Sequence, residues 1–246
     1  MKITPIVTRT IFLYDDLYAI LEESLPKLKE KSIIVISSKI ISLCEGAVLD
    51  THTIAKDTLV KHEADAYVYS MPGLYLTKKQ GILIPSAGID ESNALGYYVL
   101  YPRDLLTSTN VVGEWLKKIY SVKDLGVIVV DSHTTPMRRG VLGLGLCWYG
   151  FSPLYSYLGK RDCFGRPLQM TAINLVDALS ASAVLCMGEG DEHTPLAIIE
   201  NAPKVSFHSF PTRQEDIAAL GIDETEDIYG PILRSIAWQS THMGTC

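Results

Sequence analysis

The stretch Gly126–Gly140, GVIVVDSHTTPMRRG, decides the fold of this chain. Its four consecutive apolar residues, Val127 to Val130, predict a strand buried on both faces, because a short β-branched run suits a strand that is covered on either side. The run meets Asp131, and the residues Ser132 to Pro136 predict a turn directly after it. The end of this strand is therefore a border between rigid scaffold and loop, where functional sites commonly form.

Asp131 itself allows two interpretations. Arg138 and Arg139 follow closely in the sequence and suit phosphate or carboxylate oxygens, which favours catalytic roles for Asp131 and Arg138. Alternatively, Asp131 only caps the loop by accepting hydrogen bonds from backbone amides, as aspartate commonly does. This stretch alone leaves both interpretations open.

The composition indicates a soluble globular protein. At 246 residues the chain has enough material for a single domain, 1–246, or for two interleaved subdomains. Hydrophobic residues make up 47% of the chain and charged residues 20%, which excludes a disordered or fibrous class. The net charge of −6 offers no surplus of cations to displace phosphate counterions, so we expect no binding to nucleic acid.

Cysteine usage and the amino terminus predict the compartment. The five cysteines are odd in number and form no CxxC pair, which argues against a disulfide framework or a zinc site and favours core cysteines in a reducing environment. The amino terminus, MKITPIVTRT, lacks the apolar core of a signal peptide, and no apolar run is long enough to span a bilayer. We therefore expect a cytoplasmic protein that does not bind membranes.

Apolar runs and helical periodicity divide the chain into alternating strands and helices. The predicted strands besides Val127–Val130 are Lys2–Ile11, Ser32–Ser37, Ile82–Pro85, Val141–Tyr149 and Leu196–Ile199. The predicted helices are Leu17–Leu25 after Asp15 and Asp16, Pro102–Tyr120, Thr171–Met187, a short acidic helix near Glu215, and Pro231–Ser240. The glycines Gly143 and Gly145 lack the pattern of a phosphate-binding loop and indicate a strand packed closely on another backbone, as between subunits.

Three turns rich in oxygen atoms follow ordered elements. They contain Asp90 with Asn93, Asp131 with Ser132, and Glu189 in the loop after the helix that ends at Met187. Each turn would by default be a solvated cap. If the fold brings them together, their carboxylates would form a hard-metal site able to bridge nucleotide phosphates.

The order of these motifs resembles the coenzyme F420-0:γ-glutamyl ligase family, from Ile3 to about Pro203. Four short motifs carry the resemblance: DDL at 15–17, SSKIISLCEG at 37–46, GIDESNA at 88–94, and VVDS followed by PMRRG. The longest block starts at Gly150, GFSPLYSYLGKRDCFGRPLQMT, runs into DALSASAVLCMGEG and ends near Pro195.

The resemblance implies an enzyme that uses GTP or ATP and Mg²⁺ or Mn²⁺, with K⁺ as a further cation, to join L-glutamate to an acceptor carboxylate. It implies an α+β fold of mixed sheets with flanking helices in an intertwined homodimer. By that likeness the metal ligands are Asp90, Asp131, Ser132 and Glu189, where the family prefers Thr for the third and has Gln or Glu for the fourth. The nucleotide contacts are Thr8, Arg9, Thr10, Ile11, Ser38, Lys39, Asn93, Met187, Gly188, Gly190, Asp191 and Thr194.

Several residues depart from the family's pattern and leave the acceptor open. Leu43 replaces a lysine, Glu91 stands where an arginine is common, and the residues 133–135 replace an aromatic, a glycine and an arginine. The family's acceptor is a phosphate-bearing deazaflavin, whereas a folate would tolerate the lost cations better. A flat acceptor ring would stack on aromatic residues. The candidates are Trp148, Tyr149, Phe151, Tyr155 and Tyr157.

Two hypotheses from other classes compete with a ligase. Leu43 suggests a catalytically silent relative that only binds a nucleotide or a pterin-like ligand. The second hypothesis is a structural protein in which these acidic residues only cap turns.

Overall fold

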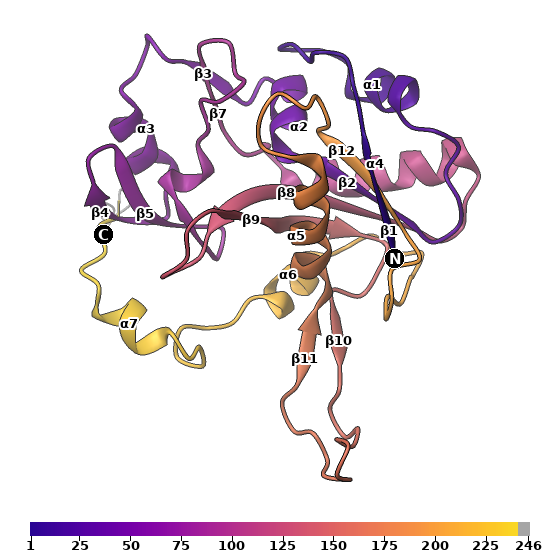
Figure 1. Ribbon diagram of the computed structural model, residues 1–246. Coiled ribbons are helices and arrows are strands. Elements are labelled where there is room, and N and C mark those ends of the chain that lie inside the picture. Colours follow the sequence, from indigo (N-terminus) through magenta and orange to yellow (C-terminus); the bar gives the residue numbers. More distant parts are fainter. Residues whose placement is uncertain (241–246) are drawn as a thin grey trace.

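A mixed five-stranded sheet forms the centre of the molecule, whose computed structural model describes residues 1–240 (Figure 1). In spatial order its strands are β1 (Lys2–Ile6), β12 (Leu196–Glu200), β2 (Ser32–Ser37), β8 (Leu125–Thr134) and β9 (Val141–Tyr149). Strands β2 and β8 pair in parallel, and the other neighbours are antiparallel. Cys246 lies outside the described residues.

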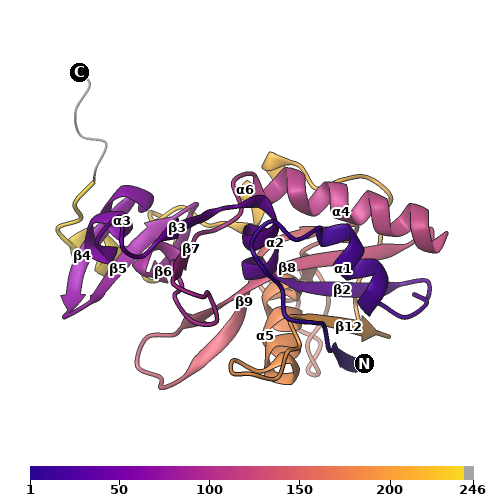
Figure 2. The same cartoon turned by 90° about the horizontal axis from the view of Figure 1, so that it is seen from above.

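Helices cover both faces of this sheet (Figure 2). On one face lie α1 (Leu17–Ser24), α2 (Ser38–Glu45) and α4 (Leu105–Tyr120), which share a hydrophobic cluster with the sheet. On the other face lies α5 (Leu175–Met187) with a second cluster. The sheet residues Val127 and Ile128 belong to opposite clusters and are both fully buried. This confirms the predicted strand covered on both faces and the α+β class.

The predicted turn after Asp131 is wrong, because β8 continues to Thr134. Residues 131–134 pair with β9 in register, Asp131 opposite Leu144 and Thr134 opposite Val141. Asp131 therefore belongs to a strand that projects beyond the parallel pairing with β2, which ends opposite Val130. The turn itself follows at residues 135–140.

The predicted glycine contact is confirmed, but the partner is a helix of the same chain. A Cβ atom on Gly143 would lie 2.4 Å from the backbone oxygen of Ser180, and one on Gly145 would lie 2.2 Å from Val176. The Gly145 amide donates to Asp177 of α5 at 3.1 Å, which gives that carboxylate a partner inside an apolar helix. The glycines therefore let β9 approach α5 and lend no support to contact between subunits.

Three predicted boundaries shift for local reasons. Strand β1 ends at Ile6 because its partner β12 begins opposite it at Leu196. Helix α5 begins only at Leu175, since Asn174 caps it and the preceding residues form β11 (Ala172–Asn174). The last helix, α7 (Gly230–Ser235), stops early, and Gln239 instead pairs its backbone with Tyr67.

A smaller lobe, residues 48–99, is inserted between α2 and α4 (Figure 2). It has its own cluster of buried residues, including Leu59, Tyr75 and Tyr98. Its elements are β3 (Val48–Asp50), α3 (Lys56–Glu63), β4 (Ala66–Met71), β5 (Leu74–Lys79), β6 (Ile82–Pro85), the 3-10 turn Ser86–Gly88 and β7 (Tyr97–Val99). The lobe confirms the predicted strand at Ile82–Pro85.

Two further segments extend from the sheet. A projecting arm is built on β10 (Leu154–Ser156) and β11, which pair antiparallel (Figure 1). The carboxyl-terminal segment contains α6 (Gln214–Leu220) and α7 and returns to the small lobe. No helix within residues 1–240 is both long and apolar enough to cross a membrane.

Candidate active site

A cavity of about 680 Å³ opens where the small lobe meets the edge of the main sheet. Its walls come from the segment after β1, the start of α2, the loop 88–101, the end of β8 and the loop after α5. All the predicted metal and nucleotide residues line it: Thr8, Arg9, Thr10, Ile11, Ser38, Lys39, Asp90, Asn93, Asp131, Ser132, Met187, Gly188, Glu189, Gly190, Asp191 and Thr194. Segments that are far apart in the sequence thus converge on one site.

The start of α2 lines this cavity with its amino-terminal residues. Strand β2 passes directly into the helix at Ser38, and Ser37 takes the N-cap position without a side-chain bond to the first-turn amides. Free amides at a helix amino terminus attract phosphate or carboxylate groups, and the helix dipole adds to this attraction. Ser37, Ser38 and Lys39 all line the cavity, so an anion could lie against these amides.

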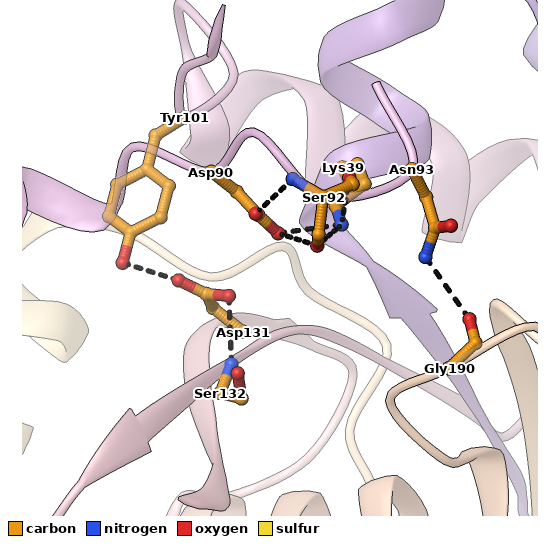
Figure 3. Close-up of polar contacts among 8 residues, drawn as sticks. All are labelled: Lys39, Asp90, Ser92, Asn93, Tyr101, Asp131, Ser132 and Gly190. Atoms are coloured by element: carbon orange, nitrogen blue, oxygen red, sulfur yellow. Dashed lines mark hydrogen bonds and ion pairs between the residues drawn. The ribbon is translucent and has the colours of Figure 1, made fainter. Parts of the chain in front are cut away.

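Asp131 lies on the sheet side of the cavity and is held by two neutral donors (Figure 3). One carboxylate oxygen accepts the Tyr101 hydroxyl at 2.9 Å, and the other accepts the Ser132 amide at 2.8 Å. The pKa of Asp131 is raised to about 6: burial is the largest cause and the charge of Asp90 adds to it, while these two hydrogen bonds and the charge of Lys39 act to lower it. The loop-capping interpretation is therefore correct for one contact but does not describe the whole environment.

Asp90 lies on the lobe side of the cavity and has a cationic partner (Figure 3). Its carboxylate is 2.6 Å from the Lys39 ammonium and accepts the Ser92 amide at 2.7 Å. Burial acts to raise the pKa of Asp90, but the hydrogen bond and charge of Lys39 outweigh it, so the pKa lies below its ordinary value. Lys39 also donates to the Ser92 carbonyl at 2.9 Å, which anchors the loop of the small lobe to α2.

Glu189 completes the acidic group from the loop after α5. Desolvation raises its pKa, the Ser132 hydroxyl bond and the Lys39 charge oppose this rise, and the charges of Asp90 and Glu192 add to it. The same loop is joined to the small lobe by Asn93, whose side-chain amide donates to the Gly190 carbonyl at 3.1 Å (Figure 3). The charge of Asp90 therefore acts on both Asp131 and Glu189.

The donor chemistry of this group fits a hard divalent cation. Three carboxylates and the Ser132 hydroxyl are oxygen ligands of the kind that Mg²⁺ and Mn²⁺ prefer. The negative charge of Asp90 helps to raise the pKa values of Asp131 and Glu189, and a bound cation would relieve this repulsion. Within residues 1–240 no group of three Asp, Glu, His or Cys side chains is already arranged to hold a metal ion, and Lys39 lies beside Asp90 instead.

Three residues singled out from the sequence, Arg138, Glu91 and Leu43, differ in how they relate to the cavity. Arg138 does not line the cavity and lies in the exposed β8–β9 turn. Glu91 does line it, but its carboxylate is 2.7 Å from the Lys56 ammonium, so its charge has a partner. Leu43 packs with Ala94 and Val99 in a small apolar cluster that forms part of the cavity wall.

The prediction that an acceptor ring stacks on aromatic residues is wrong for three of the five candidates. Trp148, Tyr149 and Phe151 are at most 1% exposed, because β9 and the residues after it lie between helices on both faces. Tyr155 and Tyr157 are on the arm, where Lys160 lies over both rings, at 4.0 and 5.1 Å from their centroids. These five residues do not line the cavity.

The prediction of core cysteines holds for Cys147, which is buried, and is wrong for Cys163 and Cys186, which are exposed thiols. Sequence reasoning also missed two residues that contact the predicted acids, Tyr101 and Ser92. Ser92 lies two residues from Asp90, so its proximity was a usable signal. Tyr101 follows an apolar strand and precedes a proline, and nothing in that pattern connects it to Asp131.

Comparisons with known proteins agree with this geometry. The family model described as F420-0:Gamma-glutamyl ligase matches residues 5–201. A protein of Methanopyrus kandleri named coenzyme F420:L-glutamate ligase is 32% identical over 218 residues, which cover 80% of this chain and 86% of that protein. Proteins of the same name from Methanococcus maripaludis and Methanocaldococcus jannaschii are each 31% identical, over 72% and 71% of this chain and 78% and 77% of theirs. The chain therefore belongs to the F420-0:gamma-glutamyl ligase family.

Proposed function

We propose that this chain is a nucleotide- and divalent-metal-dependent ligase that joins L-glutamate to the carboxylate of an acceptor. The observation that carries the proposal is that one cavity is lined by every predicted metal and nucleotide residue. The names of the relatives, coenzyme F420:L-glutamate ligase, support glutamate as one substrate and a deazaflavin as the default acceptor.

The nucleotide, GTP or ATP, would direct its phosphates toward the amides at the start of α2 and toward Lys39. This orientation follows from charge, since Lys39 and the uncapped helix terminus are cationic features of the wall, whereas Arg9, which also lines it, is ion-paired with Asp15 at 2.5 Å. The segments Thr8–Ile11 and 187–194 would enclose the rest of the nucleotide. They are joined by a backbone bond from the Thr8 amide to the His193 carbonyl at 2.9 Å, so they would close around it together.

Asp90, Asp131, Ser132 and Glu189 would hold the metal. A bound Mg²⁺ or Mn²⁺ neutralises phosphate oxygens and polarises the transferred phosphoryl group. For this purpose Asp131 must be ionised, and its pKa of about 6 leaves it charged at neutral pH. Lys39 would move from Asp90 toward the phosphates when the metal takes its place beside that carboxylate.

The reaction itself requires activation of the acceptor, because a free carboxylate does not form an amide in water. The acceptor carboxylate would attack the terminal phosphorus of the nucleotide, giving an acyl phosphate and a nucleoside diphosphate. The glutamate amine then attacks the acyl carbon, and phosphate leaves as the amide forms. No covalent attachment to the protein is needed, so none of its cysteines takes part.

The acceptor remains a choice between a deazaflavin and a folate. One reason to favour a folate was the negative charge of Glu91, but Lys56 pairs with it. Stacking on the aromatic candidates does not separate the two acceptors, because both carry a flat ring and these residues lie away from the cavity. The deazaflavin F420-0 is therefore the acceptor that we propose.

The protein would act as a homodimer, as the family likeness implies. The turn between β8 and β9 exposes Met137 almost completely and leaves Val141 and Leu142 about half exposed. Arg138 lies in the same turn, so its catalytic role depends on contact with a second copy. Light scattering that gives the mass of a monomer at micromolar concentration would count against the dimer and against this role of Arg138.

One experiment tests the function. The purified protein is incubated with L-glutamate, Mg²⁺ or Mn²⁺, and GTP or ATP, with F420-0 or dihydrofolate as acceptor, and products are weighed by mass spectrometry. We expect one glutamyl unit to be added to F420-0 and nucleoside diphosphate to appear in equal amount. Addition to dihydrofolate alone would transfer the proposal to a folylglutamate synthase. Nucleotide binding without glutamate-dependent hydrolysis would identify a catalytically silent relative.

A further inference from the structure

Tyr101 is a buried residue that contacts the site yet belongs to none of its predicted groups. It is 7% exposed, and its hydroxyl donates to one Asp131 oxygen at 2.9 Å. Its side chain packs closely against Gly88, where a Cβ atom would come within 2.3 to 2.5 Å of two ring carbons and the hydroxyl oxygen. Gly88 also has a φ of +71°, which disfavours any larger residue there. The ring therefore has a defined place, and so has the hydroxyl.

The two donors to Asp131 leave each of its oxygens a free lone pair. A carboxylate oxygen accepts two hydrogen bonds or ligands, and Tyr101 and Ser132 each take one position on a different oxygen. Figure 3 shows the Tyr101 hydroxyl and the Ser132 amide bound to opposite ends of the carboxylate. The rotation of the carboxylate is thereby fixed, with capacity left on both oxygens for a cation.

Tyr101 also connects the two acidic walls of the cavity. Asp90 exchanges two backbone hydrogen bonds with Val99, at 3.1 and 2.8 Å, and Val99 is two residues before Tyr101. Asp90 and Tyr101 are therefore connected through one short bridged backbone segment at the border of the small lobe, whereas Asp131 belongs to β8. The hydroxyl bond is the direct link from that unit to the sheet carboxylate.

We propose that Tyr101 is a positioning residue that sets the orientation of Asp131, and its separation from Asp90, for binding a divalent cation. This inference rests on the proposed metal dependence. Partners that orient a metal ligand in this way typically change metal affinity by about 10-fold to 100-fold when removed. A merely structural role would instead change the stability of the fold and leave the affinity for metal intact.

Tyr101→Phe removes only the hydroxyl, and Tyr98→Phe is its matched control. Tyr98 is also 7% exposed, but it packs in the core of the small lobe and does not line the cavity. Tyr101→Leu serves as a second variant, in case the phenylalanine variant folds poorly. Binding of Mn²⁺ alone to the full-length protein is measured by electron paramagnetic resonance of the free ion, and melting temperatures are recorded without metal.

We expect the Kd for Mn²⁺ to rise about 10-fold or more in Tyr101→Phe and to stay unchanged in Tyr98→Phe. An unchanged Kd in Tyr101→Phe would overturn the positioning role and leave the metal site standing. An equal rise in both variants would also overturn it, because general packing would then be the cause. If the native protein does not bind Mn²⁺, the proposed metal dependence fails and this inference fails with it.

Discussion

The two acidic walls of the cavity are built on different principles. On the sheet wall Asp131 has only neutral partners, and burial raises its pKa to about 6. On the lobe wall Asp90 is equally part of the site, but Lys39 is 2.6 Å away and keeps its pKa below the ordinary value. Asp90 is paired directly with a cation, whereas Asp131 feels the charge of Lys39 only from beyond ion-pair distance.

This difference indicates where an external cation is needed most. A carboxylate that is desolvated without a directly paired charge lowers the stability of the fold, and such groups occur mainly at functional sites. Asp131 is such a group, whereas Asp90 is satisfied by Lys39 in the absence of any ligand. The negative charge of Asp131 on the sheet wall should therefore need the metal to balance it. On the lobe wall, Asp90 should become available to the metal when Lys39 moves away.

The largest effect is expected from Asp131→Asn. The amide can accept the Ser132 amide hydrogen with its oxygen and donate to the Tyr101 oxygen, so the fold should persist. The charge that holds the cation is lost, and we expect glutamate-dependent nucleotide hydrolysis to fall roughly 100-fold to 1,000-fold.

Asp124→Asn is the matched control, since Asp124 lies just before β8 and does not line the cavity. It should retain full turnover. Native turnover of Asp131→Asn would show that the charge of Asp131 is not needed for the reaction. The proposed difference between the two carboxylates would then have no functional consequence.

Lys39→Met tests the lobe wall. Its ammonium is the cation proposed to contact the phosphates, and a hydrogen bond to a charged group contributes about 1.5 to 3 kcal/mol. We expect the KM for the nucleotide to rise by roughly 10-fold to 100-fold. Lys29→Met is the control because Lys29 is also ion-paired, at 2.7 Å from Glu200, but lies away from the cavity. If the nucleotide KM is unchanged in Lys39→Met, the lysine serves Asp90 alone.

The stability of the metal-free protein should reveal the missing cation of the sheet wall. Because burial raises the pKa of Asp131 from 3.8 to about 6, the folded state binds this proton more tightly than the unfolded state. The contribution of Asp131 to the unfolding free energy is thus present below about pH 4 and is lost as pH rises through about 6.

Asp131→Asn removes this dependence, so it should exceed the native protein in stability by up to about 3 kcal/mol at pH 7.5 and approach it near pH 4. Urea unfolding at both pH values, without metal, measures the difference. Saturating Mn²⁺ should reverse the order at pH 7.5 by binding only the native protein. Equal stability at pH 7.5 without metal would contradict the raised pKa.

The main sheet could be predicted from the sequence because its strands are continuous apolar runs. Val127–Val130 and Ser32–Ser37 are covered on both faces, and this leaves a direct signal. The same continuous apolar pattern does not show whether Trp148 is buried or exposed, because a fully apolar strand gives no sign of which residues reach a surface. The end of β8 was misplaced because residues 131–134 are polar on a strand that pairs only with β9.

The residues of the site could be predicted from their motifs, but their relations could not. Asp90, Asp131 and Glu189 each follow an apolar run or a helical pattern in the sequence, which is what indicated them as candidates. That Lys39 pairs with Asp90, and Tyr101 with Asp131, depends on how the small lobe folds against the sheet. That lobe has mixed burial and short strands, which carry little periodic signal.

The smallest effect is expected where the carboxyl-terminal segment holds the small lobe. The Lys78 ammonium pairs with Glu224 and lies 4.5 Å from the centroid of the Trp238 ring, while Tyr67 and Gln239 exchange backbone hydrogen bonds. These residues lie beyond the cavity, and partly exposed ion pairs and cation–π contacts contribute about 1 kcal/mol or less each. Lys78→Met should therefore lower the unfolding free energy by about 1 kcal/mol and speed amide exchange in β4 and β5, with Lys118→Met on the exposed side of α4 as the control.

Because the lobe carries Asp90, looser attachment should raise the Kd for Mn²⁺ slightly, by less than the loss of the Tyr101 hydroxyl does. A larger rise than in Tyr101→Phe would mean that the attachment of the lobe, and not the local hydroxyl bond, sets the distance between the two walls.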